Sequence, residues 1–140
     1  MDSATLTTVA SIIAGVGGTM LSFRIQRELQ MHEQGEPPWI PYADWLLIST
    51  VMLSLFLVIL PLVAFSVTSP FVLRFARAAC TAITIMVGGY IFSLLAHYRL
   101  IFGQGRSGPR DNPEPAERRF VQLTTVLAVA LFVAVLTEVL

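Results

Sequence analysis

The sequence predicts an all-α integral membrane protein with four transmembrane helices. Four uncharged apolar segments, each close to the ~20 residues that a helix needs to cross the ~30 Å hydrocarbon core of a bilayer, lie at residues 4–23, 45–67, 78–96 and 120–137. The chain is 55% hydrophobic and only 13% charged, with a mean hydropathy of +0.73, whereas roughly a quarter of the residues of a soluble domain are charged. The connections are too short to bury a second core, so residues 1–140 are expected to form a single four-helix transmembrane domain.

The first helix is expected to span about residues 4–34 and to extend beyond the bilayer. Asp2 precedes the apolar segment, and the basic residues Arg24 and Arg27 follow it, which reverses the charge order of a secretory signal peptide. Strong helix formers continue without a breaker as far as Gly35, a residue that suits a left-handed helix cap. The sequence therefore predicts a retained transmembrane helix whose end forms a cytoplasmic stem.

The second helix is expected at about residues 45–67, with its start at the membrane surface. Asp44 is expected to cap its first turn through the carboxylate. Pro61 lies inside the helix and removes a backbone N–H, so we expect a bend there, either as a packing kink or as a gating hinge. Aromatic side chains suited to the membrane interface are found at Trp39, Tyr42 and Trp45.

The remaining elements are expected at about residues 71–100 (third helix), 103–115 (a flexible loop rich in Gly and Pro) and 114–139 (fourth helix). Arg74 and Arg77 lie one turn apart, just before the uncharged core of the third helix. They are expected to anchor the helix at the outer headgroups. Glu138, near the end of the fourth helix, is expected either to pair with one of these arginines or to remain solvated.

The arginines predict the orientation of the chain. All nine basic residues are arginines, and seven of them lie in the segments after the first and third apolar segments. Basic residues near helix ends are retained on the cytoplasmic side. Both long connections are therefore expected in the cytoplasm and both termini on the non-cytoplasmic side of the cell inner membrane.

Small residues predict the faces where helices pack. Helices in lipid have no hydrophobic driving force toward one another, so association depends on small side chains that let backbones approach. The first and third helices are therefore expected inside the bundle or at a subunit interface, while the fourth, rich in Val, Leu and Phe, is expected to face lipid. The predicted packing residues are Ser11, Ala14, Gly15, Gly18, Ala78, Ala82, Gly88 and Gly89.

The sequence predicts no catalytic, cofactor or metal site. The apolar segments contain no Asp, Glu, Lys, Arg or His, although proton-coupled transporters and intramembrane proteases need such groups at depth. Cys80 is the only cysteine, which excludes a disulfide or a CxxC site within the chain. His32 and His97 are expected to be lone, solvated histidines. A formal net charge of zero argues against a nucleic-acid partner.

Arginine and tyrosine side chains gather near the predicted cytoplasmic helix ends, at Arg24, Arg27, Tyr98, Arg99 and Arg106. With its topology, the chain resembles the membrane-associated eicosanoid and glutathione metabolism proteins, which are trimers of small four-helix subunits. The resemblance implies that these side chains would bind glutathione carboxylates and polarise a thiol. The family's signature Arg-Ala-His-x-Asn-x-x-Glu is replaced here by Pro41-Tyr42-Ala43-Asp44-Trp45, so the resemblance covers architecture and not motif.

These features favour a small non-enzymatic membrane module that works as a homo-oligomer, with a pore or channel as its more specific form. Two alternatives stay open: an accessory or structural subunit of a larger membrane complex, and a glutathione-type membrane transferase with a cytoplasmic-side site. The expected partners are the lipid bilayer and copies of the chain or other membrane subunits. A pore would be lined by the first helix, which combines hydroxyl groups with glycines, and the candidate lining residues are Thr8, Ser11, Ile12, Ile13, Val16 and Thr19.

Overall fold

The computed structural model describes residues 2–35, 41–65, 69–101 and 114–138. Within this part of the chain, 89% of the residues are helical and none forms a strand. The elements are α1 (Ser3–Glu33), α2 (Tyr42–Leu53), the π-helical η1 (Ser54–Ile59), α3 (Leu60–Ala64), α4 (Pro70–His97) and α5 (Pro115–Leu136). Because α2, η1 and α3 are continuous, the described residues form four helices long and apolar enough to cross a membrane. The predicted all-helical architecture is confirmed at this level.

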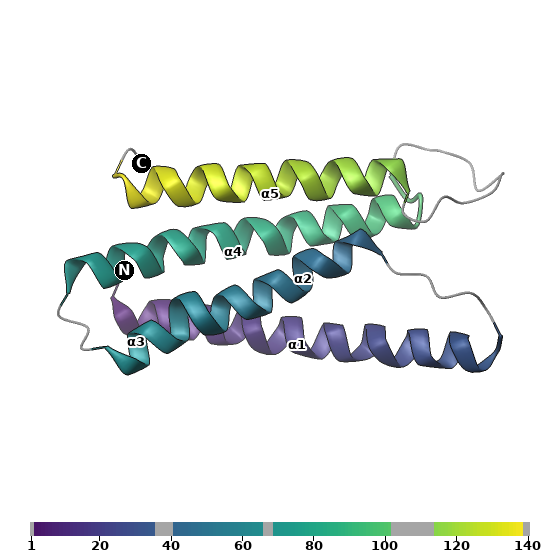
Figure 1. Ribbon diagram of the computed structural model, residues 1–140, viewed down its shortest axis with the longest axis horizontal. Helices are drawn as coiled ribbons and strands as arrows, with labels where there is room; N and C mark the ends of the chain where they lie inside the picture. Colours follow the sequence, from purple (N-terminus) through teal and green to yellow (C-terminus); the bar gives the residue numbers. More distant parts are fainter. Residues whose placement is uncertain (1, 36–40, 66–68, 102–113, 139–140) are drawn as a thin grey trace.

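The helices lie side by side in an elongated bundle (Figure 1). α5 packs along α4, α1 lies on the opposite side, and the rod of α2, η1 and α3 crosses obliquely between α1 and α4. The marked N- and C-terminal ends lie at one end of the bundle, which we call the terminal end. α1 and α4 finish at the other end, and α2 and α5 begin there. We call it the arginine-rich end.

Local sequence explains both ends of α1. The Asp2 carboxylate accepts a hydrogen bond from the Thr5 N–H at 2.8 Å, which satisfies one of the free N–H groups of the first turn. Hydrogen bonds from the side chain and the backbone N–H of Thr5 lower the pKa of the Asp2 carboxyl, because they stabilise its charged form. At the other end, α1 finishes at Glu33, and Gly35 has a φ of +78°, the left-handed conformation of a glycine cap.

The π-helical segment η1 lies directly before Pro61. A proline has no N–H to donate to the carbonyl four residues earlier, and here the ladder widens so that the Leu60 N–H bonds to the carbonyl of Leu55, five residues back. Such π turns are a recognised cause of helix bending. The structure thus has an irregular helix where the proline predicts a bend.

α4 is the central helix of the bundle, because it contributes to both apolar cores. One core joins α4 to α1, η1 and α3 and contains Leu6, Ala10, Val58 and Ile83. The other joins α4 to α2 and α5 and contains Leu47, Met86, Tyr90 and Ala128. The alanines of α4 allow this close packing on two sides. α5 exposes large apolar side chains such as Leu123 and Val126.

Candidate functional site

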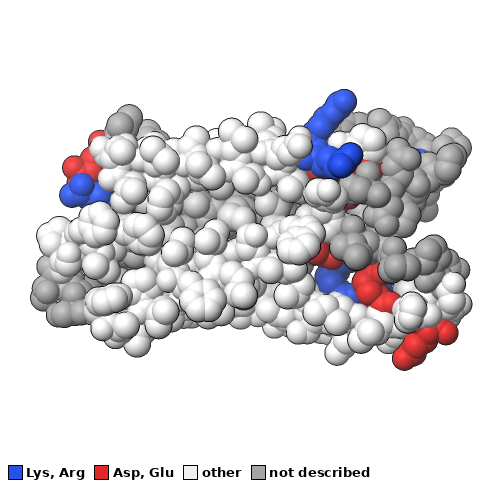
Figure 2. Space-filling model, viewed as in Figure 1, with Lys and Arg blue, Asp and Glu red and all other residues white. Residues whose placement is uncertain are grey.

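A polar cluster at the arginine-rich end connects all four helices. Its members, which we call the polar cluster, are Arg24 and Arg27 of α1, Asp44 of α2, His97 at the end of α4, the following Tyr98, and Glu117 of α5. Figure 2 shows charged side chains at both ends of the visible face and an uncharged middle. In the sequence, the members of the polar cluster flank the uncharged apolar segments of their helices, where a membrane interface would be expected.

Arg24 joins three helices through one guanidinium group. Its Nε and Nη2 each donate to the Asp44 carboxylate at 3.3 Å, and its Nη1 donates to the Tyr98 hydroxyl at 2.9 Å. Both charged side chains are largely buried, with 12% of Arg24 and 14% of Asp44 exposed. Burial makes an unpaired charge costly, so this ion pair acts as a polar connection between α1, α2 and α4.

Arg27 approaches the same tyrosine from one turn farther along α1. Its Nη1 donates to the Tyr98 hydroxyl, and its guanidinium carbon lies 5.5 Å from the centre of the Tyr98 ring. Two guanidinium groups therefore converge on one hydroxyl oxygen. Of the residues expected to form a glutathione site, the structure brings Arg24, Arg27 and Tyr98 together. A glutathione carboxylate would have to displace the Arg24–Asp44 ion pair to reach Arg24.

Glu117 forms the most buried part of the polar cluster. Its side chain is fully buried, its Oε1 accepts a hydrogen bond from the Ala43 N–H at 2.8 Å, and its Oε2 lies 2.8 Å from Nδ1 of His97. Ala43 is in the first turn of α2, where backbone N–H groups lack partners within the helix. A carboxylate of α5 thus accepts a hydrogen bond from a backbone N–H at the start of α2, and His97 of α4 contacts the same carboxylate.

Two expectations from the sequence are corrected here. Asp44 does not cap α2: the cap residue is Pro41, and Asp44 lies inside the first turn with its carboxylate on Arg24. His97 is not solvated, because only 1% of it is exposed and it contacts Glu117. The physical reason is the same in both cases. A polar side chain near a helix end takes its partner from a neighbouring helix, and helix packing determines that partner.

Arg99 belongs to a separate ion pair beside the polar cluster. Its Nε donates to Oε1 of Glu114 at 2.9 Å, which connects the residues after α4 to the residue before α5. Arg106, the other arginine considered for a glutathione site, lies outside the described residues. At the terminal end, Nη2 of Arg74 lies 2.9 Å from Oε1 of Glu138, so one of the two alternatives for Glu138 is realised. Arg77 is exposed.

The predicted packing residues divide into two groups. In α4, Ala78 and Ala82 are buried, and a Cβ at Gly89 would lie 2.1 Å from the Thr124 side chain of α5. The others do not face a neighbouring helix so closely. A Cβ at Gly15, Gly18 or Gly88 would meet no atom within 4 Å, Ser11 is exposed and Ala14 is half-buried.

Gly17 is a packing residue that sequence reasoning missed. A Cβ there would lie 2.7 Å from the Val51 side chain. The spacing of Leu6, Ala10, Ile13 and Gly17 could have identified this face, since these residues recur every three to four positions. Ile13, a candidate pore residue, packs against the core, whereas Thr8, Ser11, Ile12, Val16 and Thr19 are exposed.

Two of the aromatic residues predicted at the membrane interface, Tyr42 and Trp45, lie at the start of α2. Tyr42 is 39% exposed and Trp45 is 59% exposed, while Trp39 lies outside the described residues. The guanidinium carbon of Arg118 in α5 lies 5.5 Å from the centre of the Tyr42 ring. His32 is exposed near the end of α1.

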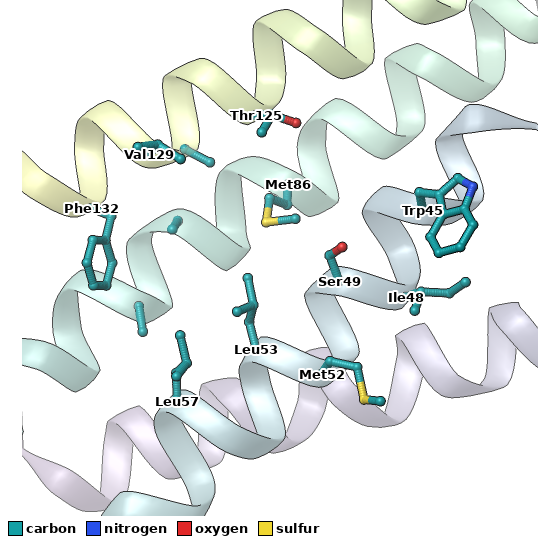
Figure 3. A pocket seen from close by; sticks show the side chains of 13 residues that line it. Trp45, Ile48, Ser49, Met52, Leu53, Leu57, Met86, Thr125, Val129 and Phe132 are labelled. Atoms are coloured by element: carbon teal, nitrogen blue, oxygen red, sulfur yellow. The ribbon is translucent and has the colours of Figure 1, made fainter.

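An apolar groove begins beside Trp45 and runs toward the middle of the bundle. It has a volume of about 490 Å³. α2 and η1 form one wall, α5 forms the other, and Ala79, Ala82 and Met86 of α4 form the floor. Figure 3 shows these side chains around the space between the three helices, from Trp45 at one end to Leu57 and Phe132 at the other.

Comparison with protein-family models, with curated proteins and with solved structures found no significant match for this chain. Among the described residues, no three His, Cys, Asp or Glu side chains are grouped to hold a metal ion.

Proposed function

We propose that the protein is a non-enzymatic membrane module that assembles with copies of itself through the outward face of α1. The observation that carries this proposal is the composition of that face. Leu6, Ala10 and Gly17 contact the bundle, and the face opposite to them on the helix carries hydroxyl groups and a glycine. These residues, which we call the hydroxyl stripe, are Thr8, Ser11, Gly15, Thr19 and Ser22, and all five are exposed.

The hydroxyl stripe suits contact with another helix better than contact with lipid. The Thr8, Thr19 and Ser22 hydroxyls donate to carbonyls four residues earlier in α1, at 2.8, 2.9 and 2.9 Å, so their polar groups are already satisfied. The surface that remains is small, and a Cβ at Gly15 would meet open space. Small residues let two helix backbones approach closely, which is how helices associate in lipid.

A pore is the more specific form of the proposal. If several copies turned their hydroxyl stripes toward a common axis, the lining would be hydroxyl groups without fixed charge, and such a lining would discriminate ions weakly. If the stripe instead contacts a different polypeptide, the protein is an accessory subunit. In either case the arginine-rich end would lie in the cytoplasm and both termini on the other side, because basic residues are retained on the cytoplasmic side.

Two glycine variants test the assembly. Gly15→Leu and Gly88→Leu each place a leucine where the single chain has open space, so both variants should fold, but only Gly15→Leu enlarges the hydroxyl stripe. We expect Gly15→Leu to shift the purified protein from an oligomer toward a monomer by about tenfold or more in dissociation constant, which corresponds to about 1.4 kcal/mol. Single-molecule photobleaching in bilayers counts the chains per assembly.

Gly88→Leu should keep the oligomer of the unmodified protein. A monomeric unmodified protein, or equal effects of the two leucines, would contradict assembly through α1. Oligomers that pass no current across planar bilayers would contradict the pore but not the assembly through α1.

A further inference from the structure

The apolar groove and an arginine at its end point to a lipid site. We propose that the groove holds one acyl chain of an anionic glycerophospholipid and that Arg118 binds the phosphate of that lipid. The inference rests on the membrane insertion proposed above, but not on oligomerisation or on a pore.

The lining of the groove suits a hydrocarbon chain. Of its thirteen lining residues, only Ser49 and Thr125 carry a hydroxyl group, and the Thr125 hydroxyl already donates to the Val121 carbonyl at 2.8 Å. Figure 3 shows aliphatic and aromatic side chains on both walls and the Met86 side chain on the floor. A polar ligand would lose its hydrogen bonds to water without replacement in such a groove, whereas an acyl chain loses none.

The length of the groove matches one leaflet of a bilayer. Trp45 and Leu57, at the two ends of its α2–η1 wall, are twelve residues apart, which is roughly 18 Å along a helix at 1.5 Å per residue. Half of the ~30 Å hydrocarbon core is about 15 Å. The groove therefore runs from the interface, where Trp45 is suited to lie, to about the middle of the membrane.

The volume favours a single chain over a helix of a second copy. A helix about 10 Å across would need roughly 1,400 Å³ over this length, far more than the 490 Å³ of the groove. A hydrocarbon chain about 5 Å across, as carbon contact distances require, fills roughly 350 Å³ over the same length. The volume of the groove therefore matches an acyl chain better than a whole helix.

Arg118 lies where the headgroup of that lipid would be. It is exposed and precedes Thr125 by seven residues on α5, and this spacing places both on one face of the helix. Its guanidinium lies over the Tyr42 ring, a contact that orients the group without neutralising its charge. Figure 2 shows basic atoms over the first turn of α5, next to the uncharged middle of the face. An oriented guanidinium binds a phosphate through paired hydrogen bonds.

Tryptophan quenching by brominated lipids tests this site. A Trp39→Phe variant leaves Trp45, which is exposed at the end of the groove, as the only fluorophore of its kind. The full chain is reconstituted in vesicles that contain brominated phosphatidylglycerol or brominated phosphatidylcholine at the same mole fraction. One arginine near the surface contributes a preference of about fivefold for an anionic lipid. We expect the relative binding constant from quenching to favour phosphatidylglycerol by about that factor.

Neighbouring arginines supply the matched control. Arg118→Gln should remove the preference for phosphatidylglycerol, while Arg119→Gln, which changes another exposed arginine on a different face of α5, should keep it. Ser49→Phe, which places a ring in the groove, should lower quenching by both lipids. If this variant does not fold, the comparison of the two arginine variants still tests whether Arg118 binds the lipid phosphate.

Three outcomes would overturn the lipid site. The first is equal quenching by the two lipids in the Trp39→Phe protein, and the second is an equal effect of the two arginine variants. The third is quenching by both lipids that falls as the ratio of protein to lipid rises, since a second copy would then occupy the groove. A complete absence of quenching by either lipid would instead contradict membrane insertion itself.

Discussion

Glu117 is the residue whose environment differs most from what its place in the sequence indicates. It lies in the first turn of α5, where an acidic residue is commonly an exposed partner of the helix dipole, yet its side chain is fully buried between three helices. Its two oxygens serve the Ala43 N–H and the His97 ring. Removing the carboxylate would leave the buried Ala43 N–H without this acceptor and would take one contact from the buried His97 ring. The loss of such buried polar contacts is costly in a folded protein.

Shortening this side chain should therefore destabilise the bundle. We expect Glu117→Ala to lower the free energy of unfolding by about 3 kcal/mol and Glu117→Gln to lower it by roughly half as much, because the amide still offers an acceptor to the Ala43 N–H. Unfolding of the micelle-embedded protein, followed by circular dichroism, measures both. The control is Glu33→Ala, at an exposed position near the end of α1, which should change stability by less than about 0.5 kcal/mol. Similar losses in Glu117→Ala and Glu33→Ala would show that the buried contacts contribute nothing.

At the scale of the elements, Gly89 has the tightest surroundings of the described glycines, and it lies where α4 contacts α5. A Cβ at Gly89 would lie 2.1 Å from Thr124, whereas a Cβ at Gly88 would meet nothing within 4 Å. The two glycines are adjacent in the sequence, but successive residues of a helix point about 100° apart. One therefore belongs to the interface and the other does not.

This difference predicts that substitution by alanine changes the free energy of unfolding differently at the two glycines. Gly89→Ala should destabilise the protein by about 1–3 kcal/mol, because the added methyl group overpacks the contact with α5. Gly88→Ala should instead be neutral or stabilise it by up to about 1 kcal/mol, since alanine is the better helix former. The difference in unfolding free energy between the two variants is the measurement. Effects of the same sign would mean that α4 and α5 do not meet at Gly89.

At the scale of the whole molecule, the arrangement of the ends determines how the chain could sit in a membrane. The marked chain ends lie at the terminal end, where Arg74 pairs with Glu138, and the polar cluster lies at the other end. An uncharged middle separates them on the face that Figure 2 shows. Basic residues are retained in the cytoplasm, so the arginine-rich end is expected there.

Cysteine labelling tests this orientation. In a Cys80→Ala background, Ser3→Cys should react with a membrane-impermeant maleimide added outside sealed cells, and Ser107→Cys should react only after the cytoplasm is opened. The positive-inside rule predicts this difference. Reaction of Ser107→Cys from outside would reverse the orientation and move the proposed phosphate contact of Arg118 to the outer leaflet.

The sequence by itself determined which segments form helices long and apolar enough to cross a membrane. The apolar segments are long and uncharged, and helix length and hydropathy are local properties that need no tertiary information. The glycine cap at Gly35 and the irregular helix before Pro61 could also be predicted, because both depend on the local sequence. An even number of antiparallel helices also brings the two marked chain ends to the same end of the bundle.

Only the tertiary structure decided which side chains meet. Asp44, His97 and Glu117 are polar residues near helix ends in the sequence, but their partners come from other helices at rotations that the sequence does not encode locally. The same holds for the glycines of α1, because Gly17 faces Val51 while Gly15 faces outward. The groove between α2 and α5 is likewise a property of the helix crossing. Hydropathy identifies a helix, but its rotation about its own axis is set by packing against its neighbours.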